Sequence, residues 1–256
     1  MNVIYDGSLE GLLSAIFEIY DRKISCAAIC RKEKVTALDM FDNLEVYSDP
    51  AKAARVLNAL ENKVSAATIK NIYCCLLSEL DGIEDQVLAF TRYAFASAQN
   101  IESDYGNAAV LEIAQVARKV GREKHRFEAF VRFQQIKDDF YYAAIDPDYN
   151  VLPLIVPHFK RRYAAQDWLI YDTRRRYGIH YDSKTEQVHE AVMDFDPGSD
   201  NGSNTCIAID TDEAHYQSLW KHYFKHVNIP ARKNMKLHLQ HVPRRYWKYL
   251  VEKQIG

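Results

Sequence analysis

The hydrophobic periodicity of the chain changes at about Gly121. Before that residue, apolar side chains recur every three to four positions, which is the period of helices that bury one face. Over 127–134, apolar and polar residues alternate, which is the period of a strand. We predict an α+β fold, with a helical N-terminal half and an antiparallel sheet of hairpins packed with C-terminal helices. This order of elements excludes a nucleotide-binding fold of regularly alternating strands and helices.

Capping signals divide the first region into separate helices. Ser8, Asp49 and Ser65 each precede an amphipathic pattern, and side-chain oxygens of these types accept hydrogen bonds from the first N–H groups of a helix. Pro50 fits the first helical position, and we expect Gly82 to end the third helix. The predicted elements of this mostly helical region, 1–105, are a strand over 2–5, helices after Ser8, Asp49 and Ser65, and a helix over 84–98.

The second region, 106–256, is predicted to be α+β and to form either its own domain or one integrated unit with the first region. Its strands form two hairpins, and a turn over 173–176 joins the second pair. Between them, Pro157 should interrupt a short helix. Asp210 with Glu213 fits a capping box. The predicted elements are helices over 107–120 and 210–227, strands over 127–133, 140–145, 168–172, 177–182 and 187–192, and short helices before and after Pro243.

Neither the cysteines nor the histidines follow the spacing of a known metal site. Cys26 and Cys30 match the first spacing of a radical S-adenosylmethionine cluster motif, C-x3-C-x2-C, but Glu33 occupies the third position. Five C-terminal histidines have no carboxylate or thiolate at motif spacing. They are His215, His222, His226, His238 and His241. We therefore predict no metal and no cofactor.

The net charge of −2 conceals a gradient along the chain. Residues 1–117 carry 10 basic and 17 acidic side chains, whereas residues 118–186 carry 14 and 10. Between Lys221 and Lys253 there are nine basic residues and one acidic residue. The second half is therefore the part expected to face a polyanion.

Four basic clusters in this half contain or adjoin aromatic residues. Arginine offers a planar fork of donors for phosphate oxygens, and tyrosine or tryptophan rings stack on unpaired bases. The clusters are 121–126, 158–162, 174–176 and 243–249. The alternative is that these arginines form ion pairs with acidic residues across the sheet. The acidic candidates are Asp138, Asp139, Asp146, Asp148, Asp167 and Asp172.

Four segments carry a family resemblance. They are YDGSLEGLLSAIFEIYDRK (5–23), GREKHRFEAFVRFQ (121–134), DPDYNVLPLIVPHFKRRYAAQDWLIYD (146–172) and RKNMKLHLQHVPRRYWKYLVE (232–252). Together they resemble a bacterial family of DNA-metabolism or DNA-repair proteins whose activity is not established. Its members are typically encoded beside a DNA-repair-linked radical S-adenosylmethionine protein, and a similar region is fused to uracil-DNA-glycosylase-like domains. The resemblance implies a function connected with DNA.

We expect the nucleic-acid-binding residues where the resemblance and the basic clusters coincide. These residues are Arg122, His125, Arg126, His158, Arg161, Arg162, Arg244, Arg245, Tyr246 and Trp247. The expected ligand is single-stranded or damaged DNA, bound by an accessory factor that works with a radical S-adenosylmethionine partner. The resemblance supplies no catalytic residue.

Two other functions fit the same sequence. A nucleic-acid-processing enzyme would use His125 or His158 with Glu123 or Asp172 as acid and base, since histidine titrates near neutral pH. A protein–protein interaction module would dock a partner on its aromatic C-terminal helices. Salt-dependent affinity for DNA separates the binding protein from the interaction module, and turnover on damaged oligonucleotides identifies the enzyme.

Apolar segments in this chain are short. None approaches the roughly 18 residues that a membrane span needs, and the N-terminus lacks the features of a signal peptide. We expect a cytoplasmic protein that does not bind membranes.

Overall fold

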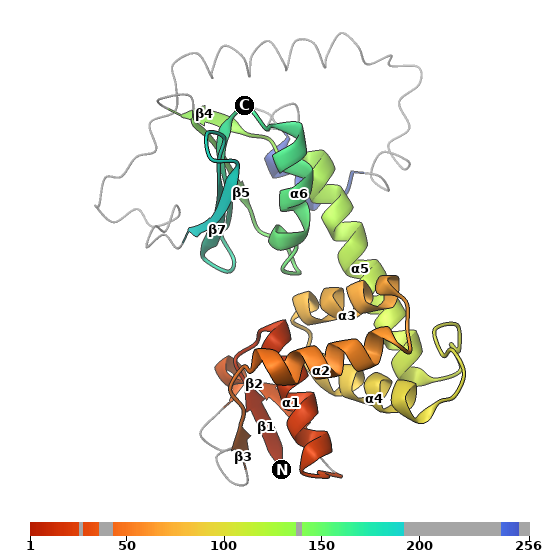
Figure 1. Ribbon diagram of the computed structural model, residues 1–256. Helices are drawn as coiled ribbons and strands as arrows, with labels where there is room; N and C mark the ends of the chain where they lie inside the picture. The colour runs from red at the N-terminus through yellow and green to blue at the C-terminus, as the bar shows by residue number, and fades with distance from the viewer. Residues whose placement is uncertain (26–27, 36–42, 137–139, 192–241, 251–256) are drawn as a thin grey trace, which may run out of the picture. The chain divides into compact units, whose positions relative to one another are not determined.

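The computed structural model describes residues 1–25, 28–35, 43–136, 140–191 and 242–250. The chain divides into two compact units, unit 1 over 1–122 and unit 2 over 123–256. Each unit combines helices with a sheet, which confirms the predicted α+β class (Figure 1).

A three-stranded parallel sheet forms part of unit 1. β1 (Asn2–Tyr5) lies between β2 (Ala28–Arg31) and β3 (Asn43–Glu45), and both neighbours run parallel to it. Helix α1 (Leu9–Asp21) connects β1 to β2, so unit 1 contains a βαβ unit. Only the strand over 2–5 was predicted. β2 has one buried residue and the three-residue strand β3 has none, so neither shows the alternating burial of β1.

The predicted N-caps of the first three helices are confirmed. Ser8, Asp49 and Ser65 each accept a hydrogen bond from an N–H group in the first turn of the following helix. Those helices are α1, α2 (Pro50–Glu61) and α3 (Ala66–Ser78). The caps satisfy donors that have no partner within the helix, which fixes where each helix begins.

The end of the third helix differs from the prediction. α3 stops at Ser78, and Glu79 takes a left-handed backbone conformation with φ 54°. Gly82, with φ 75°, is the residue before α4 (Ile83–Ala96). Left-handed backbone is easier for glycine than for residues with a Cβ atom. The glycine therefore marks the start of α4 and not the end of α3.

Helix α5 (Ala108–Phe130) is longer than predicted and replaces most of the strand expected over 127–133. Phe127 and Val131 are four positions apart and are both buried, whereas Ala129 between them is exposed. The apolar residues of this segment thus fit a helical period as well as a strand period, and the helix continues into it.

Unit 2 contains a five-stranded sheet in the order β4-β5-β6-β7-β8. The strands are β4 (Gln134–Ile136), β5 (Phe140–Ile145), β6 (Asp167–Asp172), β7 (Tyr177–Asp182) and β8 (Gln187–Ala191). The antiparallel pairs β4–β5, β6–β7 and β7–β8 agree with the predicted hairpins and added strand. β5 and β6 run parallel, so the sheet is mixed. The helix between them returns the chain in the same direction, as a parallel connection requires.

That helix, α6 (Leu152–Arg162), covers one face of the sheet (Figure 1). Its Phe159 ring lies 6.3 Å from the ring of Trp168, which is fully buried and stacks on Tyr181 at 5.3 Å. The prediction that Pro157 interrupts this helix is wrong, because α6 continues through the proline. The proline lies on the exposed side, and burial of the opposite side against the sheet offsets the lost hydrogen bond.

The 3-10 helix η4 (Arg244–Tyr249) follows Pro243, as predicted, and packs on α5. The ring of Tyr246 lies 5.4 Å from that of Phe127 and 5.3 Å from that of Phe130. The polar loop, helix and histidines predicted within 192–241 lie outside the described residues, as does Cys26. None of the helices that the structure describes is long and apolar enough to cross a membrane.

Candidate nucleic-acid interface

In unit 2, α5 has α6 on one side and η4 on the other. Toward α6, Glu128 approaches His158, with Oε1 3.9 Å from Nδ1. Toward η4, Arg126 and Phe130 lie against Tyr246. Residues of α5 whose side chains point neither toward α6 nor toward η4 therefore form an exposed ridge between these two neighbours.

All ten predicted binding residues lie on these three elements, and we call six of them the arginine face. On α6, His158, Arg161 and Arg162 follow i, i+3, i+4 spacing, which places them on one side of the helix. Both of these arginines are exposed, in the last turn of α6, where basic side chains complement the helix dipole. The arginine face comprises His125, Arg126, His158, Arg161, Arg162 and Arg244.

The arginines of this face have no carboxylate partner among the described residues. The ion pairs described in unit 2 involve the two histidines of the face, His125 and His158, and basic side chains outside the face. Three arginines of the face lie over aromatic rings instead. The distance from the guanidinium carbon to the ring centroid is 5.7 Å for Arg126 on Tyr246, 5.7 Å for Arg162 on Tyr163 and 6.0 Å for Arg244 on Trp247. A guanidinium stacked on a ring keeps N–H donors at its edge for phosphate oxygens.

Glu128 is the acidic residue closest to both histidines of the face. Lys124 donates to it at 2.6 Å, and Nδ1 of His125 lies 4.0 Å from it. The enzyme hypothesis paired these histidines with Glu123 or Asp172 instead. Both of those carboxylates bond to other groups, so the structure does not bring the hypothesised acid–base pairs together.

Three other arginines are ion-paired, as the alternative interpretation predicted. Arg245 pairs with Asp148 and with Glu123, which is 3% exposed and also accepts hydrogen bonds from the backbone at 148 and 149. Arg175 Nη1 lies 2.9 Å from Asp172, which is fully buried. Arg174 Nη1 lies 3.3 Å from Asp148. This carboxylate–arginine network fixes the turn after β6 and the end of η4.

Burial raises the pKa of Asp172 above its ordinary value. Hydrogen bonds from the side chain of Arg175 and from the backbone at 174 and 175 act in the opposite direction. The protonated form of Asp172 is therefore favoured by folding.

The remaining predicted residues differ in accessibility. Tyr246 is 1% exposed and packs on α5, so its ring is not free to stack on a base. Trp247 is half-buried, and its Nε1 donates to the backbone oxygen of Val242 at 3.1 Å. Arg122 is exposed at the last position of unit 1, one helical turn before Arg126.

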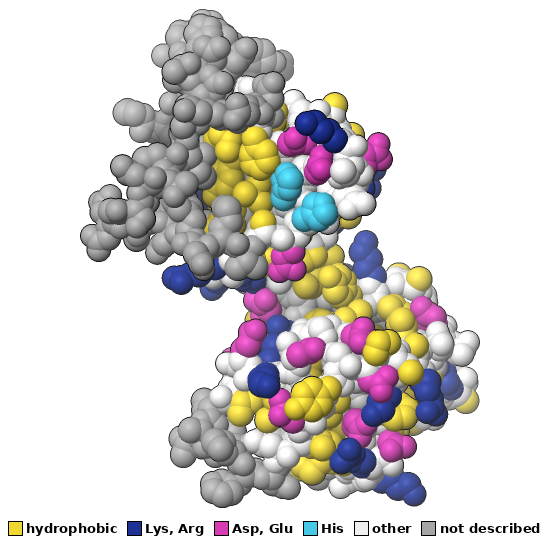
Figure 2. Space-filling model, turned by 60° about the vertical axis from the view of Figure 1, so that its left-hand side comes forward, with side chains coloured by type: hydrophobic (Ala, Val, Ile, Leu, Met, Phe, Trp, Pro, Cys, Tyr) yellow, Lys and Arg dark blue, Asp and Glu magenta, His cyan; other side chains and the backbone are white. Residues whose placement is uncertain are grey.

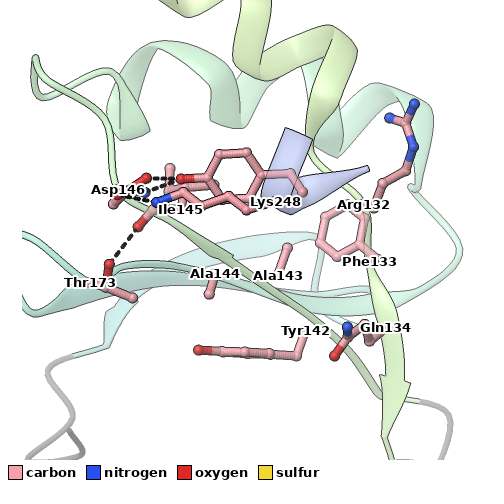
Figure 3. Close-up of a pocket in the computed structure, with 11 residues that line it drawn as sticks. Arg132, Phe133, Gln134, Tyr142, Ala143, Ala144, Ile145, Asp146, Thr173 and Lys248 are labelled. Atoms are coloured by element: carbon pink, nitrogen blue, oxygen red, sulfur yellow. Dashed lines mark hydrogen bonds and ion pairs between the residues drawn. The ribbon is translucent and has the colours of Figure 1, made fainter. Parts of the chain in front are cut away.

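A pocket of about 300 Å³ lies between η4 and β5 (Figure 3). Ala143 and Ile145 of β5 line it, together with Phe133, Arg132 and the end of η4. At the η4 end, Asp146 accepts hydrogen bonds from Lys248 and from the hydroxyl of Tyr249. The pocket thus combines aromatic and aliphatic walls with a neutralised carboxylate.

A different surface of unit 2 carries hydrophobic side chains beside histidines (Figure 2). The rings of His180 and His189 stack with centroids 6.4 Å apart, and Phe140 lies 5.5 Å from His180. Asp167 and Asp182 interact electrostatically with His180. The carboxylates make this face less suited to a polyanion than the arginine face.

Sequence reasoning missed several residues of this region. Arg132 was interpreted as an outward residue of a strand, whereas it follows α5 and lines the pocket. Glu128, Lys248 and Tyr249 lie in the segments that carry the resemblance, but a carboxylate or phenol alone gives no signal of a site. The i, i+3 and i, i+4 spacing of Lys124 and His125 to Glu128 would have revealed the cluster if the segment had been predicted as helix.

The structure also bears on the metal prediction. Among the described residues, no group of three or more histidine, cysteine, aspartate or glutamate side chains is arranged to hold a metal ion.

Comparison with known proteins places the chain in a family. No curated protein matches it. A family model described as a domain of unknown function, DUF4130, matches residues 81–252. The matched range includes α5, α6, η4 and the whole sheet of unit 2. The chain therefore belongs to the DUF4130 family.

Proposed function

We propose that unit 2 binds nucleic acid through the arginine face and that the protein acts in DNA metabolism as an accessory factor. The observation that carries this proposal is the contrast among the arginines. Those of the carboxylate–arginine network are neutralised, whereas Arg126, Arg161, Arg162 and Arg244 have no carboxylate partner among the described residues. Phosphate oxygens supply the bidentate acceptors that such guanidinium groups fit.

The choice of DNA rests on the family resemblance of the sequence, and so does the radical S-adenosylmethionine protein as partner. Aromatic side chains next to the arginines favour single-stranded or distorted DNA, since its bases are open to stacking. Trp247 is the half-buried ring of η4 that would serve this purpose.

The test measures binding of single-stranded and duplex oligonucleotides by fluorescence anisotropy at several salt concentrations. If Arg161 and Arg162 each contact a phosphate of a single strand, replacing both with glutamine should reduce the log–log salt slope by about 1.4. The matched control replaces Arg176 and Lys184, which removes the same charge from the exposed turns of the sheet. Equal slopes for wild type and the Arg161→Gln, Arg162→Gln variant would refute the arginine face as a phosphate-binding surface.

A second candidate is acid–base chemistry on nucleic acid at Glu128. Two imidazoles lie within 4.0 Å of this carboxylate, and imidazole and carboxylate groups are the side chains that general acid–base catalysis uses most often. Turnover of damaged oligonucleotides by wild type, abolished in Glu128→Gln with binding intact, would favour this enzyme over the accessory factor.

A further inference from the structure

The pocket between η4 and β5 has rigid aromatic walls. Phe133 is fixed by edge contacts with Phe159 at 5.4 Å and with Tyr163 at 5.2 Å. Tyr249 is fixed because its hydroxyl both donates to the Asp146 carboxylate and accepts from the Asp146 N–H. Anchored rings on two sides of a cavity suit a flat ligand, because stacking then costs little side-chain entropy.

Within the described residues, one edge of β5 has no pairing partner inside this pocket. Thr173 N–H donates to the Ile145 oxygen at 2.8 Å, so the backbone groups of Ile145 point toward β6. Those of Ala144 point to the opposite edge, because successive residues of a strand alternate. β4 does not pair there, since its ladder with β5 ends at Gln134 opposite Tyr142. The pocket therefore offers one peptide N–H and one peptide C=O side by side.

The charges around the pocket favour a ligand that has an uncharged part joined to an anionic group. The carboxylate of Asp146 is neutralised by Lys248 inside the pocket. Within the described part of the chain, Arg132 donates only to the backbone oxygens of Ala129 and Val131, and no carboxylate pairs with it. A flat, neutral ligand in the pocket could thus carry a phosphate that meets Arg132.

We propose that this pocket holds one unpaired nucleobase, stacked beside Phe133 and Tyr249 and hydrogen-bonded to the peptide group of Ala144. The assignment rests on the proposed function, because the arginine face would hold the phosphates on either side of that base. Bases present adjacent donors and acceptors on one edge, which match a peptide N–H and C=O. A peptide strand fits less well, since Tyr249 already occupies the next edge position, the N–H of Asp146.

The experiment compares two duplexes that differ at one bulged position, where one carries the fluorescent base 2-aminopurine and the other an abasic residue. Wild type should bind the base-containing bulge at least about fivefold more tightly, because stacking of one base on protein rings has that value or more. The fluorescence of 2-aminopurine should fall on binding, as it does when this base stacks.

Two alanines provide matched variants. Ala143 lines the pocket on the same side of β5 as Phe133 (Figure 3), whereas Ala165 is exposed and is not part of the pocket lining. Ala143→Leu fills the pocket and should bring the ratio of the two affinities to about one, while the affinity for the abasic bulge stays unchanged. Ala165→Leu adds the same atoms away from the pocket and should keep the preference.

The outcomes separate the two proposals. Equal affinity of wild type for both bulges, or an Ala143→Leu variant that keeps the preference, overturns the base pocket and leaves the arginine face standing. If neither bulge nor single-stranded DNA binds, the proposed function and the pocket assignment fall together. The wild-type comparison decides even if Ala143→Leu does not fold.

Discussion

The Nδ1 atom of His158 lies 3.9 Å from Oε1 of Glu128, and this contact joins α6 to α5. The same carboxylate accepts a hydrogen bond from Lys124 and lies 4.0 Å from His125. One acidic side chain thus faces a lysine and two histidines. The carboxylate therefore links the two helices that carry five of the six residues of the arginine face.

The variant His158→Gln tests whether this contact positions the arginine face, since glutamine keeps a hydrogen-bonding group in place of the imidazole. We expect the variant to fold normally and to lose about twofold to fivefold in affinity for DNA. Anisotropy titrations measure this, with His180→Gln on strand β7 as the control. Equal affinities of wild type and His158→Gln for DNA would assign His158 a structural role alone.

Arg244 and Arg245 are neighbours in sequence with different expected effects. Arg244→Ala removes an exposed guanidinium without a carboxylate partner in the described structure, so the variant should fold normally and bind DNA with a reduced salt slope. Arg245→Ala removes a partner of the buried Glu123 and should reduce the free energy of unfolding by about 1–3 kcal/mol. Urea denaturation of both variants measures the difference, and equal stability would contradict it.

Features of the fold that depend on a few adjacent residues were predicted correctly. Ser8, Asp49 and Ser65 begin helices because a side-chain oxygen meets free N–H groups one turn later, which is a property of a few adjacent residues. The boundary near Phe127 was wrong because a short apolar series fits both periods. The parallel pairing of β5 with β6 also depends on α6 crossing the sheet, and no pattern within either strand encodes that.

The candidate site shows the same limit. Basic clusters are visible in the sequence, but Arg161 and Arg245 look alike there, and only the fold places Arg245 beside Glu123, 122 positions away. The pocket depends on where β4 stops pairing with β5, which leaves the edge at Ala144 open. Such features arise from register and packing between distant segments, so composition and spacing do not predict them.

Folding of the described units should not require a metal ion. Treatment with a chelator should leave the thermal unfolding midpoint unchanged, because the described residues contain no group of metal-ligating side chains and their helices are capped and packed without one. Differential scanning calorimetry before and after chelation, with metal analysis of the purified protein, measures this. Stoichiometric zinc or iron whose removal unfolds the protein would contradict the prediction.

The buried carboxyl of Asp172 should give the stability a specific pH dependence. Its pKa in the folded protein is raised above the unfolded value of 3.8, so folding favours the protonated form. The resulting stabilisation is fully present below 3.8 and is lost as the pH rises through the folded pKa. The stability of wild type relative to Asp172→Asn should therefore decrease as the pH rises above 3.8.

The control is Asp182→Asn, because hydrogen bonds from the backbone at 184 and from Thr185 lower the pKa of Asp182. Its carboxylate stabilises the fold above 3.8, so the advantage of wild type over that variant should be lost as the pH falls below 3.8. Urea denaturation from pH 2.5 to pH 7 distinguishes the two signs, and a wild-type advantage over Asp172→Asn that grows with rising pH would show that the Arg175 ion pair outweighs burial.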